Sequence, residues 1–171
     1  MADRPCSVLF LCTANSARSI LAEGILARDG AAGFRAHSAG SRPRGAVNPL
    51  ALTVLQRFGY PTAGLRSKGW DEFAAPGAPA MDVIITVCDS AAGETCPIWP
   101  GQPTTAHWGI PDPATVEGSD QQQEAAFVTA FHRLKARISA LTALPVARLD
   151  RDTLAARLRE IGSNAAAADA A

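Results

Sequence analysis

Two side chains with complementary chemistry, Cys12 and Arg18, stand six positions apart near the start of the sequence. The residues between them, TANSA at 13–17, are all small or polar. A loop without bulky side chains can curl so that its backbone N–H groups point inward and form a concave site for a tetrahedral anion. Asn15 suits such a curl, because asparagine tolerates the left-handed backbone conformation that most residues avoid. The spacing therefore predicts an oxyanion-binding loop.

The cysteine and the arginine at the two ends of this loop predict nucleophilic chemistry on the bound anion. The guanidinium of Arg18 offers two parallel hydrogen bonds to oxyanion oxygens, a geometry that lysine does not reproduce. Cys12, surrounded by positive groups, is expected to be a thiolate at neutral pH and hence a nucleophile. Ser16 and Ser19 can donate hydrogen bonds to its sulfur. The predicted oxyanion-binding residues are Thr13, Ala14, Asn15, Ser16, Ala17, Arg18 and Ser19.

Asp112 is the candidate general acid. A leaving oxygen needs a proton, so a carboxylic acid should face the loop. Asp112 follows a predicted strand and lies between Pro111 and Pro113, which restrict its backbone. An ordinary turn aspartate is the alternative interpretation, because Asp-Pro is common in turns.

Two further cysteines, Cys88 and Cys96, bracket a segment of small and polar residues that can rearrange. Taken alone, each is more simply a buried or incidental cysteine. Cys88, however, ends a predicted strand at the same sheet edge as Cys12, so these two cysteines are within reach of a disulfide. Cys96 lies one flexible loop away, and that loop can bring it to the same place. Cys6 precedes the first strand without such a partner, and a structural role is predicted for it.

The elements that must position these residues alternate between strands and helices along the chain. Main strands are predicted at 7–11, 34–38, 81–88 and 104–108, a short strand near 64–67, and helices at 18–29, 47–58, 70–74, 119–141 and 149–162. This alternation predicts an α/β fold, a single domain with a four-stranded parallel sheet, helices on both faces and a C-terminal amphipathic helix. Ligands bind at the carboxyl ends of the strands in such sheets, where Cys12 and Cys88 are both predicted to lie.

The predicted organisation is a domain over 1–145, a helical extension over 146–162 and a frayed, disordered tail over 163–171. His37, His107 and Trp108 are predicted to pack in the interior or to support the site residues.

Composition narrows the function classes. The 171 residues carry 16 basic and 16 acidic side chains, so no charge excess favours nucleic acid or an anionic membrane as a partner. No apolar run approaches the length of a membrane span, and the N-terminal run is too short for a signal peptide. A cytoplasmic location is therefore expected, where the four cysteines stay reduced. The cysteines lack C-x2-C spacing and the histidines do not cluster with them, so no metal is predicted.

Five stretches of the sequence carry a family resemblance in combination. They are LCTANSARSILAEG, HSAGSRPRG, NPLALTVLQRFGYPTAGLRSK, MDVIITVCDSAAGETCPIWPG and HWGIPDPA, which cover most of residues 7–118. They resemble the low-molecular-weight protein tyrosine phosphatase fold family, and more closely the arsenate reductases built on that fold. The resemblance implies the fold of that family, with Cys12 as nucleophile, Arg18 as anion ligand and Asp112 as acid.

The resemblance to the thiol-relay, thioredoxin-coupled arsenate reductases also implies roles for the other cysteines. Cys12 attacks arsenate while Asp112 protonates the departing hydroxide. Cys88 then attacks the Cys12 sulfur and releases arsenite, and Cys96 resolves that disulfide. The implied electron donor is an external thiol reductant, thioredoxin or a glutathione/glutaredoxin system, and no bound cofactor is implied.

Three positions depart from the family pattern. Ala14 stands where glycine is usual, and Ala17 stands where arsenate reductases commonly carry a second loop cysteine. Lys68 stands where some relatives place an acidic residue that helps to hold a potassium ion. A fixed ammonium group can take the place of that ion, so no metal requirement is predicted.

Two other functions stay open. A low-molecular-weight protein tyrosine phosphatase would use only Cys12, Arg18 and Asp112, but it would also need aromatic walls to grip a phenyl ring. The chain has one tyrosine, and Ala114 and Thr115 stand near the acid, so such walls are poorly supplied. Weak phosphatase activity is still expected, because phosphate and arsenate have nearly the same shape. The third function is a non-catalytic oxyanion-binding or redox-sensing module, which would have no use for Asp112.

Overall fold

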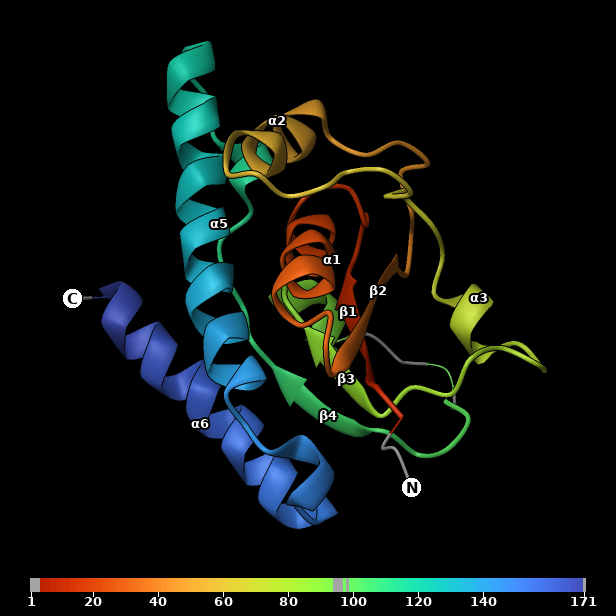
Figure 1. Ribbon diagram of the computed structural model, residues 1–171. Coiled ribbons are helices and arrows are strands. Elements are labelled where there is room, and N and C mark those ends of the chain that lie inside the picture. The colour runs from red at the N-terminus through yellow and green to blue at the C-terminus, as the bar shows by residue number, and fades with distance from the viewer. Residues whose placement is uncertain (1–3, 94–96, 98, 171) are drawn as a thin grey trace.

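The computed structural model describes residues 4–93, 97 and 99–170. Within these residues, four parallel strands form one sheet in the order β2-β1-β3-β4 (Figure 1). The strands are β1 (Cys6–Cys12), β2 (Phe34–Gly40), β3 (Val83–Thr86) and β4 (Thr104–His107). The register of the β1–β2 pair places Cys12 opposite Gly40, so both lie at the carboxyl edge of the sheet.

Helices connect the strands and cover both faces of the sheet, as the alternating pattern predicted (Figure 1). The helices are α1 (Arg18–Asp29), α2 (Pro49–Arg57), α3 (Asp71–Ala74), α4 (Asp89–Gly93), α5 (Asp120–Thr142) and α6 (Arg151–Ala170), with 3-10 turns at Pro113–Thr115 and Val146–Arg148. Helices α1, α2 and α5 pack on one another over one face, and α3 lies on the other face. Helix α6 runs along β4 and α5.

The central strand β1 is buried on both faces, as is typical of parallel sheets covered by helices. Successive side chains of a strand point to opposite faces, so its residues divide between two cores. Val8 and Phe10 belong to the main core, which they share with α1, α2, α5 and α6. Leu9 and Leu11 belong to a smaller core under α3, where they pack with Phe73.

Local capping explains where two of the connecting helices begin. The Asn48 side chain accepts a hydrogen bond from the N–H of Leu50 at 2.9 Å, and Pro49 occupies the first turn of α2. Helix α5 begins with a capping box, in which the side chains of Ser119 and Gln122 each bind the backbone N–H of the other residue.

The short strand predicted near 64–67 is wrong. These residues join no ladder, and the pairing nearby is a single bridge between Gly40 and Gly69. The backbone groups that follow this segment bind the cysteine loop and its neighbour instead of a strand. The N–H of Lys68 donates to the side chain of Asn15 at 2.9 Å, and its carbonyl accepts from the N–H of Gly40 at 2.9 Å.

Two predicted boundaries also need correction. Strand β3 is shorter than the predicted 81–88, and residues 89–93, expected to be a loop, form α4. The predicted tail over 163–171 is helical as far as Ala170, because α6 continues through it. Alanine has the highest helix propensity, and Asp169 pairs with Arg137 of α5 at 2.8 Å, so both local and tertiary effects favour this continuation.

None of the helices in the described part of the chain has the length and apolar character needed to cross a bilayer.

A substitution at Gly40 tests how closely β2 packs against the cysteine loop. A Cβ at Gly40 would lie 2.4 Å from the carbonyl oxygen of Thr13. We expect Gly40→Ala to lower the free energy of unfolding by about 1–3 kcal/mol, the usual cost of overpacking, and to weaken sulfate binding at the loop. Denaturant unfolding and the protection of Cys12 by sulfate against iodoacetamide measure the two effects.

The matched control is Gly33→Ala, because an added Cβ at Gly33 would meet no atom within 4 Å. Equal losses of stability and sulfate protection in the two variants would contradict the close packing.

Candidate active site

The residues after β1 form a closed loop at the carboxyl end of the strand. Asn15 has φ 46°, the left-handed conformation that the sequence predicted for it. Several carbonyl groups of the loop point away from its centre and accept hydrogen bonds from the segment 41–48. The donors are the N–H groups of Ser41 to Cys12, Arg42 to Thr13, Arg44 to Ala14 and Asn48 to Ser16, at 2.9–3.3 Å. On the inner side of the loop, the N–H of Asn15 donates to the Cys12 sulfur at 3.2 Å, the direction that an anion-binding nest requires.

The side chain of Asn15 holds this loop in place. It is fully buried, and its Nδ2 donates to Ser19 Oγ at 2.8 Å and to Ser38 Oγ at 3.0 Å, while its Oδ1 accepts from the N–H of Lys68. Both amide protons and the carbonyl oxygen of the side chain therefore have partners. The sequence predicted only the backbone role of Asn15, because Ser38 and Lys68 are distant along the chain.

Cys12 lies within the loop and is 3% exposed. Ser19 Oγ lies 2.8 Å from its sulfur, and the N–H of Asn15 donates to the sulfur at 3.2 Å. Burial raises the pKa of Cys12, whereas the hydrogen bonds from Ser19 and Asn15 lower it and the nearby Cys88 raises it further. Burial is the largest of these influences and opposes the predicted thiolate at neutral pH.

Of the two serines expected to bind the sulfur, Ser19 does so. Ser16 is buried, but no hydrogen bond from its hydroxyl to Cys12 is present in the described part of the chain. The contact between Ser19 and the sulfur is favoured by Asn15. Because Asn15 Nδ2 donates to Ser19 Oγ, the hydroxyl proton of Ser19 is free to point at the sulfur.

Arg18 and Asp112 come from opposite sides of the site and meet there. Arg18 Nη2 lies 3.4 Å from Asp112 Oδ2, and Arg18 Nη1 donates to the carbonyl of Ile110 at 3.1 Å. The other carboxylate oxygen of Asp112 accepts from the N–H of Ala114 at 2.9 Å and caps the 3-10 turn that follows. Asp112 is thus fixed by its own turn and by the guanidinium of the oxyanion loop.

A cavity of about 460 Å³ lies between these two residues and Cys88. Its lining is Arg18, Cys88, Asp89, Ser90, Gly109, Ile110, Pro111 and Asp112. The structure therefore brings together the predicted anion ligand, the predicted acid and one of the predicted relay cysteines around one space.

Cys88 lies at the junction of β3 and α4 and is 1% exposed. Its sulfur accepts from the N–H of Ala91 at 3.4 Å and lies 3.7 Å from Thr13 Oγ1. Thr13 directly follows Cys12 in the chain and its hydroxyl contacts the Cys88 sulfur, so this one residue connects the two cysteines. The sequence indicated Thr13 only as an anion ligand, and nothing local in the pattern pointed to this second contact. Cys96, the third predicted relay cysteine, lies outside the described residues.

His107 ties the start of α4 to the sheet beside Cys88. Its Nε2 lies 2.8 Å from Asp89 Oδ1, and its Nδ1 lies 2.7 Å from Thr86 Oγ1. These contacts give His107 a supporting place next to the site.

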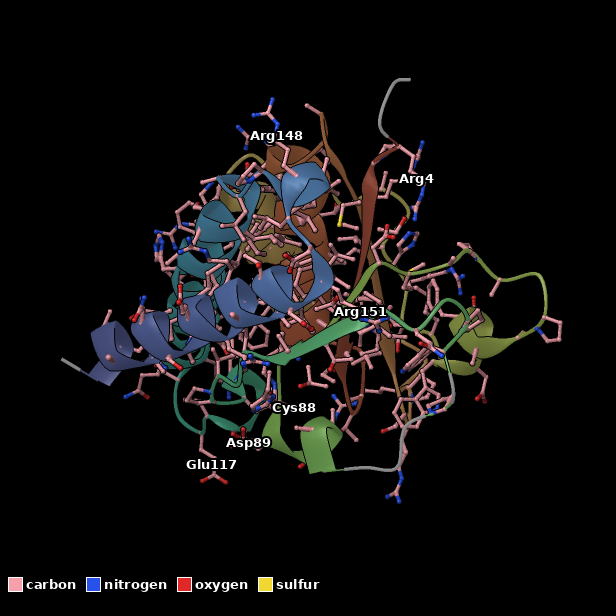
Figure 2. All side chains as sticks on the ribbon, turned by 90° about the horizontal axis from the view of Figure 1, so that it is seen from below. Arg4, Cys88, Asp89, Glu117, Arg148 and Arg151 are labelled. Carbon is pink, nitrogen blue, oxygen red and sulfur yellow. The ribbon has the colours of Figure 1, made fainter. Side chains whose placement is uncertain are left out.

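Cys6 lies apart from this site, at the start of the strand that ends in Cys12. A strand rises about 3.3 Å per residue, so the two sulfurs are separated by roughly 20 Å. Arg4 and Cys88, labelled in Figure 2, show the two opposite ends of the sheet. Burial, with a smaller effect of the Asp82 carboxylate, raises the pKa of Cys6 to about 11. A thiol in that state is unreactive at neutral pH.

Lys68 places an ammonium group where the sequence comparison with the family suggested a cation. It is 8% exposed, and its Nζ donates to Glu23 Oε1 at 3.3 Å, to Ser38 Oγ at 3.3 Å and to the carbonyl of Arg66 at 3.0 Å. Ser38 Oγ in turn donates to Glu23. Within the described residues, no group of three or more His, Cys, Asp and Glu side chains could hold a metal ion.

The fold and the site together define an α/β protein with a cysteine- and arginine-bearing oxyanion loop at the carboxyl edge of its sheet and a carboxylate facing that loop. The chain belongs to the low molecular weight phosphotyrosine protein phosphatase family, which matches residues 7–155.

Several relatives carry a more specific name. The chain is 35% identical over 120 residues to a protein of Halalkalibacterium halodurans named arsenate reductase, covering 70% of this chain and 83% of that one. A solved structure described as an arsenate reductase in the phosphate binding state is 29% identical, with a TM-score of 0.62 and coverage of 81% of this chain and 97% of that one. The Corynebacterium glutamicum thioredoxin-dependent arsenate reductase is 26% identical, with a TM-score of 0.58 and coverage of 82% and 62%.

Ser19 tests the hydrogen-bond control of the nucleophile. The Ser19 hydroxyl lowers the pKa of Cys12, so we expect Ser19→Ala to raise that pKa above its wild-type value. Because only the thiolate reacts, the curve of iodoacetamide alkylation rate against pH should move to higher pH in the variant. Ser16→Ala is the control and should leave the curve in place. Superimposable curves for Ser19→Ala and wild type would show that the hydroxyl does not act on the sulfur.

Lys68 tests the replacement of a bound cation by an ammonium group. Removing one partner of a buried ion pair leaves the other uncompensated, so Lys68→Met should lower the free energy of unfolding on the order of 3 kcal/mol. The wild-type melting temperature should be the same in potassium and in sodium chloride at equal ionic strength. A stabilisation of the wild type that is specific to potassium would contradict this interpretation.

Proposed function

We propose that this protein is an arsenate reductase that uses Cys12, Cys88 and Cys96 as a thiol–disulfide relay. The observation that supports this best is the position of Cys88, a second buried thiol that lines the same cavity as Arg18 and Asp112. A phosphatase cycle ends with hydrolysis by water and has no use for that thiol. The name shared by the relatives of Halalkalibacterium halodurans and Corynebacterium glutamicum supports the same substrate.

The first step joins sulfur to arsenic. Arsenate binds to the N–H groups of the oxyanion loop and to the guanidinium of Arg18. The sulfur of Cys12 attacks arsenic, and the thiol proton passes to an arsenate oxygen or to solvent. The departing hydroxide takes a proton from Asp112 and leaves as water. The product is a Cys12–arsenic thioester in which arsenic is still pentavalent.

The first step also requires Arg18 to change partners. In the structure, Arg18 pairs with Asp112 at 3.4 Å and donates to the Ile110 carbonyl. A bound oxyanion competes with the carboxylate for the same guanidinium. Anion binding and the contact that holds the candidate acid are thereby coupled through one side chain.

The second step transfers two electrons. The Cys88 thiolate attacks the sulfur of Cys12, a sulfur–sulfur bond forms, and the electron pair of the sulfur–arsenic bond goes to arsenic. Arsenic becomes trivalent and leaves as arsenite after taking up protons. The Thr13 hydroxyl lies 3.7 Å from the sulfur of Cys88, the attacking atom of this step, and is within hydrogen-bonding distance of it.

The third step returns the site to its starting state. Cys96 attacks Cys88 by thiol–disulfide exchange, which frees Cys12 and leaves a Cys88–Cys96 disulfide. An external dithiol, thioredoxin or a glutathione/glutaredoxin system, then reduces that disulfide. The thioredoxin-dependent relative of Corynebacterium glutamicum makes thioredoxin the first donor to test.

Hydrolysis of phosphate monoesters is a side activity of the same machinery in this proposal. Cys12, Arg18 and Asp112 suffice for a phosphocysteine intermediate that water then hydrolyses. No aromatic side chain is among the described residues that line the cavity beside Arg18 and Asp112, so this cavity offers no aromatic wall for a phenyl ring. The arrangement therefore favours a small inorganic oxyanion over an aryl ester.

The relay is tested by replacing the two cysteines that only a reductase needs. Cys88→Ser should abolish arsenite release while slow aryl-phosphate hydrolysis continues. Cys96→Ser should complete about one turnover and then stop as a Cys12–Cys88 disulfide. Arsenite production with thioredoxin and thioredoxin reductase, followed by peptide mass mapping of the stalled protein, measures both effects.

Cys6→Ser is the matched control, because Cys6 lies at the opposite end of β1 from Cys12. It should reduce arsenate at the wild-type rate. Multiple turnovers by both Cys88→Ser and Cys96→Ser would rule out the relay and leave an external thiol as the group that attacks Cys12.

A further inference from the structure

We propose that helix α6 is a positioning element for the candidate acid: it fixes Trp108, and Trp108 fixes the loop 109–112 that ends in Asp112. This inference rests on the proposed role of Asp112 as the proton donor. It adds to the site the part of α6 beyond residue 155, which neither the motif nor the family match includes.

Trp108 is the residue at which α6 and the acid-bearing loop meet. It is 1% exposed and directly follows β4. Its indole Nε1 donates to the carbonyl of Leu158 in α6 at 2.9 Å, and its backbone N–H donates to the carbonyl of Thr86 at 2.7 Å. A Cβ on Gly162 of α6 would lie 2.9 Å from Trp108 Cδ1 and 3.0 Å from the carbonyl oxygen of His107. Both the ring and the backbone at the end of β4 are therefore in close contact with α6.

The residues that directly follow Trp108 contact the site through hydrogen bonds and an ion pair. The N–H of Ile110 donates to the carbonyl of Val87 at 3.2 Å, and the carbonyl of Ile110 accepts from Arg18 at 3.1 Å. Two positions later, Asp112 pairs with the same guanidinium at 3.4 Å. A displacement of Trp108 would thus be transmitted along residues 109–112 to the candidate acid, whereas Arg18 is carried by α1.

Helix α6 is itself held at both ends. Leu154 and Leu158 are buried in the main core. Near the C-terminus, Asp169 lies 2.8 Å from Nη2 of Arg137 in α5, and Arg137 is 1% exposed. Among the described residues, Asp169 is the carboxylate within ion-pair distance of Arg137, so it compensates this buried charge. A buried cation that depends on the last turns of a helix ties that helix firmly to its neighbour.

The family match ends at residue 155, whereas Leu158, Gly162 and Asp169 all lie beyond it. Figure 1 shows this part of α6 crossing beside β4 and α5. The contacts that position Trp108 from this side are therefore supplied by the C-terminal helix of this chain and not by the matched region.

The expected consequence is a specific effect on proton transfer. The oxyanion loop is held by Asn15 through Ser19, Ser38 and the backbone of Lys68, none of which belongs to α6, so anion binding should persist when α6 shifts. Misplacing a catalytic group by about 1 Å can cost on the order of a hundredfold in rate. A variant in which α6 is pushed away from Trp108 should therefore lose kcat and keep its affinity for sulfate.

Gly162→Ala is the variant of choice, because its added methyl group collides with Trp108 and because alanine improves local helix propensity. Asn164→Ala is the control, an exposed position in the same helix. We expect Gly162→Ala to lower kcat for arsenate reduction about tenfold to hundredfold, with sulfate protection of Cys12 unchanged. Hydrogen exchange of the peptide 107–112 should become faster in this variant and stay unchanged in Asn164→Ala.

A double-variant cycle separates positioning from general destabilisation. If α6 acts through the acid, Gly162→Ala should lower the rate little further once Asp112→Asn is present. An equal proportional loss with and without Asp112→Asn would overturn the proposal, as would unchanged exchange over 107–112.

Two further arms cover failure of folding and failure of the proposed reaction. Should Gly162→Ala not fold, Trp108→Phe removes the indole N–H while keeping an aromatic ring, and the same results are required of it. Should the wild type not reduce arsenate, the cycle is run on aryl-phosphate hydrolysis, and the exchange measurement needs no activity at all. Faster exchange without a loss of rate in either assay would overturn the role of α6 in catalysis.

Discussion

The site depends on one buried side chain, the amide of Asn15. The oxyanion loop requires a left-handed residue at this point, which costs a non-glycine residue roughly 1–2 kcal/mol. The amide offsets that cost by binding three parts of the fold: Ser19 in α1, Ser38 in β2 and the backbone of Lys68. An unpaired buried amide would cost about 1–3 kcal/mol more. The loop is therefore correct only when the helix, the strand and the 64–70 segment are all in place.

This dependence explains which parts of the molecule could be predicted. The strand–loop–helix order around Cys12, the left-handed turn and the start of α1 are local properties, and local patterns sufficed for them. The predicted strand near 64–67 failed because its neighbouring backbone groups bind the loop and not a ladder, a choice made by residues some fifty positions away. The predicted frayed tail failed for a similar reason, since the buried Arg137 takes its partner from Asp169.

The residues of the candidate site also divide into those that the local sequence could predict and those that it could not. The place of Asp112 beside the loop could be predicted because two prolines and a preceding strand restrict where its side chain lies. The hydroxyl of Thr13 near Cys88, the bridge from His107 to Asp89 and the contact of Trp108 with α6 could not, because each joins separate elements. Burial likewise escapes a local pattern: positive groups around Cys12 suggest a thiolate, but withdrawal of the sulfur from water raises its pKa.

The proposed thiol–disulfide relay requires that two electrons for each arsenate come from the thiols of the chain itself. The direct measurement is a single-turnover reaction of fully reduced protein with excess arsenate and no external reductant. The account predicts about one arsenite for each chain, the loss of two titratable thiols, and a disulfide between Cys88 and Cys96 in the peptide map. Absence of arsenite with all thiols intact would contradict the account, as would arsenite formed with a disulfide that involves Cys6.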